Sequence, residues 1–218
     1  MTTTRSSWTF AIAILLAGIA AAQSPNGETA NPAADSSRDQ WSFSLNIAGY
    51  IVPHDRSYAS PVFSADRGHF HFGSRYNYED KETGSLWFGY NFQAGEKLVF
   101  RATPMVGGVF GNTTGVAPGY LAGINWKRLD LSTEGEFVFD TRSSAGNFFY
   151  SWTELSYSPR DWCRAGIVAQ RTKAYQTGLD IQRGILIGLS HKKVSFTTYL
   201  FNAGWTDPTV VLSLAFNF

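Results

Sequence analysis

Apolar and polar residues alternate along most of the chain after Trp41, which is the pattern of β-strands that have one apolar and one polar face. In WSFSLNIAGYI, Trp41, Phe43 and Leu45 share one face, and serines and an asparagine share the other. The same alternation recurs in GHFHFGSRYNYE, SLWFGYNFQ, LDLSTEGEFVFD and the final TVVLSLAFNF. No helical period of 3.6 residues appears after residue 41. The pattern therefore predicts an all-β protein.

Short turn signals separate these runs: EDKETG, QAGE, FGNTTG, NWKRLD, TRSSAGN, SPRDW, SHKK and NAGWTDP. Connections of a few residues join antiparallel neighbours, so the strands are predicted to form an antiparallel meander. Counting back from Phe218 gives about ten strands down to 67–79. The short links at 94–96, 127–128, 159–161 and 191–193 are then all expected on one side of the barrel, the periplasmic side. The segments 41–52 and 57–65 raise the number to about twelve, and single-chain membrane barrels have even numbers. Ten strands remain possible if 41–65 forms a plug or packs at the barrel mouth.

Alternation alone does not say which face meets water. A lipocalin-like barrel points its apolar face inward, and a membrane barrel points it outward. Here the polar face carries formal charges at mid-strand, more than a dry ligand pocket tolerates. The apolar faces are rich in rings, for example Phe70, Phe72, Tyr76 and Tyr78 in one run, and aromatic rings form girdles at membrane interfaces. The sequence predicts a transmembrane β-barrel with short loops and lipid outside.

The beginning of the chain differs from the rest. Residues 1–22 combine Arg5, an apolar run and small residues before Gln23, which is typical of a secretory signal peptide. Residues 23–40 are rich in Ser, Pro, Asn and Ala without an apolar period, and they predict a disordered linker. Residues 41–218 then form the predicted barrel domain.

Charge and cysteine content narrow the possible functions. Without residues 1–22 the chain has 17 acidic residues and 17 basic ones, because Arg5 is removed from the total of 18. This balance argues against a nucleic-acid partner, which needs clustered positive charge. The single Cys163 cannot form an internal disulfide, and its parity with Ala165 and Ile167 makes it a small lipid-facing residue. No cofactor or metal motif is present, so none is expected.

A signal peptide, a β meander and a last strand that ends in phenylalanine together resemble bacterial outer-membrane β-barrel proteins. In that class the last strand, with its terminal aromatic residue, is read by the barrel-insertion machinery. The residues that match this assembly signal are Val210, Leu212, Leu214, Phe216 and Phe218. The resemblance implies a bacterial outer-membrane location, with membrane lipids and the insertion machinery as partners. It leaves the oligomeric state open.

The polar face of the strands predicts what lines the interior. The candidate pore-lining residues are Arg75, Arg101, Glu134, Glu136, Glu154, Arg164 and Gln170. Centring the TRSSAGN hairpin near residue 144 puts Glu134 roughly opposite Glu154, and centring SPRDW near residue 160 puts Arg164 diagonal to Glu154. These groups can brace the wall as ion pairs, or line a narrow wet pore with weak charge selection. No predicted outer loop exceeds about ten residues, so only side chains or residues 23–40 are expected to block the lumen.

Arg183 does not fit the alternation, because it shares parity with Ile181, Ile185 and Ile187. A lipid-facing arginine at mid-membrane costs about 2–4 kcal/mol. We therefore expect either a β-bulge at Arg183–Gly184 that turns the side chain inward, or a position near the outer rim.

Enzymatic chemistry has little support in the sequence. Glu134 beside Glu154 could form an acid–base pair, but Arg164 nearby favours a structural role. His69 and His71 lie two residues apart on one strand and are expected to face the lumen, where they make only half of a zinc site. The function predicted from the sequence is a porin-like channel for passive diffusion of small solutes. The alternatives are a closed structural barrel with an ion-paired lumen and, with less support, an outer-membrane lipid hydrolase.

Overall fold

The computed structural model describes residues 40–51, 56–174, 180–204 and 208–218. The predicted signal peptide and most of the predicted linker lie outside these residues. The described chain is almost entirely strand, and no helix in it is long and apolar enough to cross a bilayer. The elements are β1 (Ser42–Ile51), β2 (Tyr58–Arg67), β3 (Phe70–Tyr76), β4 (Thr83–Tyr90), β5 (Phe92–Ala94), β6 (Leu98–Gly111), β7 (Gly115–Trp126), β8 (Leu129–Asp140), the 3-10 turn η2 (Ser144–Gly146), β9 (Phe148–Arg160), β10 (Cys163–Ala174), β11 (Asp180–His191), β12 (Val194–Phe201) and β13 (Thr209–Asn217).

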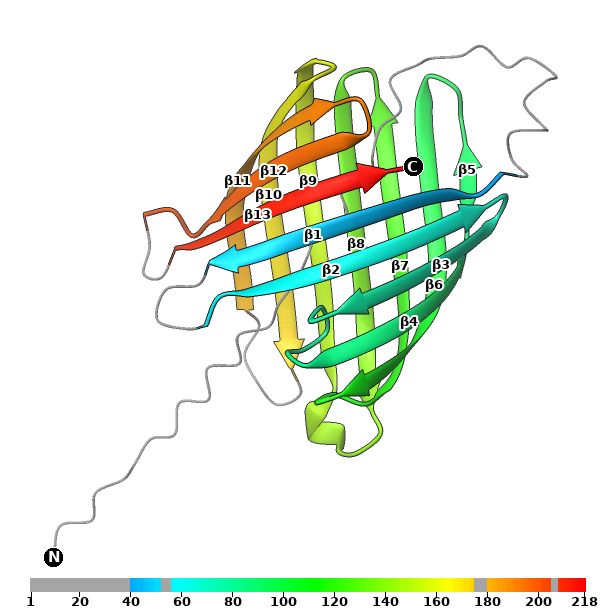
Figure 1. Cartoon of the computed structure of the whole chain (residues 1–218), viewed down its shortest axis with the longest axis vertical. Helices are drawn as coiled ribbons and strands as arrows, with labels where there is room; N and C mark the ends of the chain where they lie inside the picture. The colour runs from blue at the N-terminus through cyan, green and yellow to red at the C-terminus, as the bar shows by residue number, and fades with distance from the viewer. Residues whose placement is uncertain (1–39, 52–55, 175–179, 205–207) are drawn as a thin grey trace, which may run out of the picture.

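These strands form one closed antiparallel sheet (Figure 1). Each strand pairs with its neighbours in sequence, and β1 pairs with β13, which joins the two ends of the meander. The short β5 follows β4 directly and both pair with β6, so together they act as one interrupted strand. The described residues thus build a twelve-strand barrel, as predicted. The ten-strand alternative is wrong, because residues 58–65 lie in β2, which pairs with β1 from Tyr58 to Asp66.

The turns divide into two sets at opposite ends of the barrel. The short-turn end carries the links at 68–69, 95–97, 127–128, 161–162 and 192–193, together with Phe218. The loop end carries the connections at 77–82, 112–114 and 141–147 within the described residues. The prediction that the short links all lie on one side is confirmed to within two residues. In the membrane class that the sequence resembles, this is the periplasmic side.

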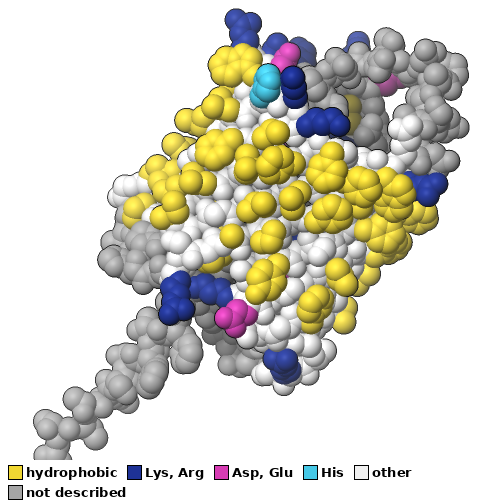
Figure 2. All heavy atoms as spheres, in the orientation of Figure 1, with side chains coloured by type: hydrophobic (Ala, Val, Ile, Leu, Met, Phe, Trp, Pro, Cys, Tyr) yellow, Lys and Arg dark blue, Asp and Glu magenta, His cyan; other side chains and the backbone are white. Residues whose placement is uncertain are grey.

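The outer face of the barrel is apolar and exposed. Aliphatic side chains occupy its middle, and Ile187 and Leu86 are 61% and 60% exposed. Aromatic rings gather toward the short-turn end, where Phe43 stacks on both Phe63 and Phe218 at 6.1 and 5.9 Å between ring centroids. In Figure 2 hydrophobic side chains cover the middle of the visible surface, and the charged ones gather at its two ends. A continuous apolar surface of this extent requires lipid rather than water.

Arg183 lies on this outer face. The pairing of β11 with β10 is regular through Arg183 and Gly184, so the predicted bulge is wrong. The predicted rim position is correct, because the Arg183 carbonyl accepts a hydrogen bond from Asn202 N just beyond the end of β12. From the rim a long arginine side chain can reach the interface, so the cost of a mid-membrane charge is avoided.

The last strand closes the barrel. Val211, Ser213 and Ala215 are buried on the inner face of β13, while the five residues of the predicted assembly signal lie on the outer face. Phe218 exchanges two backbone hydrogen bonds with Phe43, at 2.8 and 2.9 Å. The final residue is therefore tied into the seam between β1 and β13. Its role as a signal for insertion stays a prediction.

Candidate functional site: the barrel interior

The predicted pore-lining residues all lie on the inner side of the wall. Glu134, Glu136, Glu154, Arg75 and Gln170 are each less than a tenth exposed. Arg101 and Arg164 are more open, with side-chain exposures of 38% and 21%. The structure gathers most of these charges into two clusters, one around Arg75 and the other around Glu154.

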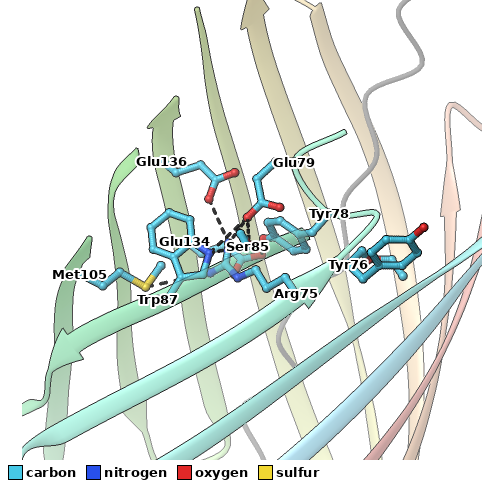
Figure 3. A network of polar contacts seen from close by, with 10 residues as sticks. Arg75, Tyr76, Tyr78, Glu79, Ser85, Trp87, Met105, Glu134 and Glu136 are labelled. Atoms are coloured by element: carbon cyan, nitrogen blue, oxygen red, sulfur yellow. Dashed lines mark hydrogen bonds and ion pairs between the residues drawn. The ribbon is translucent and has the colours of Figure 1, made fainter. Parts of the chain in front are cut away.

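Arg75, on β3, is the centre of the first cluster (Figure 3). Its Nη1 donates to Glu136 Oε2 on β8 at 2.9 Å and lies 3.8 Å from Glu79 Oε1. The guanidinium also lies over the rings of Tyr78 and Trp87, at 4.2 and 4.5 Å from their centroids. Because β3 and β8 are not neighbours in the sheet, the Arg75–Glu136 ion pair crosses the interior and does not run along the wall.

The connection at 77–82 contributes two residues to this cluster. Tyr78 and Glu79 are each only 1% exposed. Tyr78 Oη donates to Glu134 Oε1 at 2.5 Å, and Glu79 Oε1 accepts from Ser85 Oγ at 2.5 Å. A short turn thus directs two large side chains into the interior of the barrel, in line with the expectation that side chains rather than a long loop narrow it.

The alternation of residues predicts that Tyr78 faces lipid, and this prediction is wrong. β3 ends at Tyr76, and Asn77 takes a left-handed backbone conformation with φ of 52°. That conformation reverses the direction of the next side chain, so Tyr76 faces outward and Tyr78 inward (Figure 3). The only sequence signal for it was an asparagine before the turn, because asparagine tolerates positive φ better than most residues.

Small residues make room for the cluster. A Cβ at Gly107 on β6 would lie 2.5 Å from the indole of Trp87, and one at Gly119 on β7 would lie 3.0 Å from it. The indole therefore packs against bare backbone on two adjacent strands. In this position Trp87 Nε1 donates to Ser85 Oγ at 2.9 Å and to Glu79 Oε1 at 3.2 Å. The indole, which lies against the barrel wall, thus fixes the position of the Glu79 carboxylate by a hydrogen bond.

The second cluster surrounds Glu154 on β9. Its Oε1 accepts from Trp152 Nε1 at 2.8 Å and from Tyr199 Oη at 2.9 Å, and its Oε2 accepts from Arg164 Nη1 at 2.9 Å. Arg164 also donates to Thr197 Oγ1 at 3.2 Å. The predicted proximity of Arg164 to Glu154 is confirmed. Both oxygens of this buried carboxylate are satisfied, and one guanidinium balances its charge.

The predicted opposition of Glu134 and Glu154 is wrong by two residues. In the β8–β9 pair, Glu134 faces Trp152, and Glu154 faces Ser132. The hairpin is therefore centred near residue 143 and not 144, because residues 134 and 152 lie equally far from 143. The two carboxylates are therefore offset along the β8–β9 pair and do not lie directly opposite each other.

The Arg75 cluster is not balanced in the same way. Glu79, Glu134 and Glu136 each have one buried carboxylate oxygen with no hydrogen-bond partner among the described residues. These atoms are Glu79 Oε2, Glu134 Oε2 and Glu136 Oε1, and all three glutamates are 5% exposed or less. Three carboxyl groups thus share one guanidinium. The described chain holds no group of His, Cys, Asp and Glu arranged to bind a metal ion.

Toward the short-turn end the interior is more open. Arg101 Nη2 lies 3.4 Å from Asp130 Oδ2, and the Arg101 side chain is partly exposed. Asn125 Nδ2 donates to the same carboxylate oxygen at 3.3 Å. Arg101, Asn125 and Asp130 thus form a polar vestibule at the short-turn end of the interior. Gln170 lies nearer the loop end, buried opposite Trp152 on β9.

The two histidines considered as half of a zinc site are separated. His71 is buried, and its Nδ1 lies 2.8 Å from Asp66 Oδ1. His69 is exposed in the turn before β3 and stacks on Tyr90 at 5.0 Å, so its expected lumen position is wrong. Because Gly68 and His69 form the turn, the alternation of β3 begins only at Phe70.

No family model matches the sequence, and no curated protein matches it. Among solved structures, the chain is similar to a KdgM porin, with 11% identity, a TM-score of 0.58, and coverage of 80% of this chain and 99% of that one. A KdgM porin in complex with disordered oligogalacturonate gives 9% identity, a TM-score of 0.60 and the same coverage. The chain has the fold of a porin. At this level of identity the likeness shows the architecture of the porin barrel and not its solute.

Proposed function

We propose that this porin-fold barrel is an outer-membrane channel for passive diffusion of small solutes. The observation that carries the proposal is the contrast between the two faces of its wall. The outer face is an apolar surface suited to lipid, while the inner face carries ionised side chains from β3, β8, β9 and β10. A barrel built only to anchor in lipid could fill its interior with apolar residues at lower desolvation cost. A charged interior suits a water-filled path.

The path we propose runs from the polar vestibule around Arg101 past the Glu154 and Arg75 clusters to the loop end. The turn at 77–82 forms its narrowest part, because Tyr78 and Glu79 reach inward there. The outer-membrane location, the contact with lipid and assembly through the last strand belong to the same proposal. They are supported by the apolar outer face and by the similarity to porins of solved structure.

A closed structural barrel is the second candidate, and one observation favours it. The Glu154 cluster is fully paired and the Arg75–Glu136 ion pair crosses the interior, so ion pairs brace the wall. A braced wall and a narrow passage are compatible, and solute flux decides between the two functions.

Liposome swelling tests the proposal. Refolded barrel lacking residues 1–22 is placed in liposomes loaded with an impermeant polymer, and uncharged sugars of increasing size are added outside. We expect a mono- or disaccharide to cause swelling at a rate that falls steeply with solute size, because the passage is narrow. Liposomes with heat-denatured protein are the control. Equal swelling rates with folded and denatured barrel for all solutes would support the closed barrel instead.

A further inference from the structure

The Arg75 cluster has more negative than positive charge. Glu79, Glu134 and Glu136 contribute three formal negative charges and Arg75 contributes one positive charge, which leaves two negative charges at the proposed constriction. By contrast, Glu154 and Arg164 balance each other one to one. Because fields are strong where walls are close and of low dielectric, a local excess of this size acts strongly on a passing ion.

The unpartnered oxygens give a second, separate indication. Buried polar atoms nearly always have a partner, and a buried carboxylate oxygen without one leaves a large desolvation cost unrelieved. In the described chain three such carboxylate oxygens occur, and all belong to this one cluster. Among the described residues, no group of His, Cys, Asp and Glu is arranged to hold a metal ion. The charge of these buried carboxylates acts on a passing cation through the low-dielectric interior, without direct contact with the oxygens.

The aromatic surroundings suit the same class of solute. Arg75 shows how a cationic group sits there, against the rings of Tyr78 and Trp87 and beside the carboxylates of Glu79 and Glu136. Rings attract cations through their negative faces, so they add to the attraction of the carboxylates.

We propose that the constriction at the Arg75 cluster selects small cations, inorganic ions and organic ammonium or guanidinium groups alike, over anions. This inference rests on the proposed channel function and names its solute class. It also separates this barrel from the KdgM porin solved with oligogalacturonate, because a polymer of uronate sugars is anionic.

Reversal potentials in a KCl gradient at pH 8 test the inference in planar bilayers. For wild type we expect K⁺ to be about fivefold or more permeant than Cl⁻, since one unit charge at about 4 Å in water changes the free energy of an ion by about 1 kcal/mol, which corresponds to about a fivefold ratio. The variant Glu79→Gln/Glu134→Gln should bring the permeability ratio close to one without abolishing current. The single variant Glu134→Gln keeps an acceptor for Tyr78 Oη and should give an intermediate ratio, so the test does not depend on the double variant folding.

Asp161→Asn is the matched control, because it removes one carboxylate at an exposed turn of the short-turn end, 78% exposed. Its permeability ratio should equal that of wild type. A wild-type ratio at or below one, or the same ratio in Glu134→Gln as in wild type, would overturn the cation preference while leaving the channel itself intact. A folded barrel without current would instead overturn the channel proposal, and the preference with it.

Discussion

Replacing Arg75 with methionine should lower the free energy of unfolding by about 3–5 kcal/mol, because it leaves three buried carboxyl groups without their cation. Methionine keeps much of the length of the arginine stem, so packing against Trp87 and Met105 changes little. The decrease in the free energy of unfolding would therefore reflect the loss of the positive charge and not a loss of packing. Urea unfolding of the refolded barrel in detergent micelles, followed by tryptophan fluorescence, measures it.

Arg101→Met is the control for this experiment. Arg101 pairs with Asp130 at 3.4 Å, but its side chain is 38% exposed, so solvent screens the interaction. The expected loss is about 1 kcal/mol or less. Equal losses for the two variants would show that the Arg75 cluster does not hold the wall together.

Introducing arginine at Ile187 should cost about 2–4 kcal/mol in lipid, since Ile187 lies at the middle of the outer face, where no water reaches a charge. The same substitution at Ile181, close to the rim where Arg183 lies, should cost about 1 kcal/mol or less. Unfolding of both variants from phosphatidylcholine vesicles in guanidinium chloride gives the comparison. If Ile187→Arg and Ile181→Arg cost the same, the outer face is not buried in a bilayer.

Most of the fold follows from the alternation of residues. Two faces of different polarity, short turns and an even number of strands are enough to predict the twelve-strand barrel and the common end of its short links. The inward orientation of the seven candidate pore-lining residues can also be predicted, because every second residue of a strand lies on the same side of the sheet.

The errors arise where backbone conformation, rather than side-chain pattern, decides. Positive φ at Asn77 turns Tyr78 inward, and the geometry of the η2 turn shifts the β8–β9 register by two residues. Glu79 was missed because it lies in a turn, where polar residues are expected and carry no directional signal. The excess of negative charge around Arg75 could not be predicted either. It depends on contacts between β3 and β8, which lie far apart in the sequence and are not neighbours in the sheet.

Single-channel conductance of wild type, Tyr78→Ala and Tyr76→Ala in planar bilayers tests the central claim most directly. Tyr78 points into the barrel and Tyr76, two residues before it, points outward and is 48% exposed (Figure 3). We expect discrete current steps in wild type, larger steps in Tyr78→Ala because the side chain at the narrowest point is shortened, and wild-type steps in Tyr76→Ala. Folded wild-type barrels that never conduct, or equal steps in all three proteins, would contradict a passage constricted by the turn at 77–82.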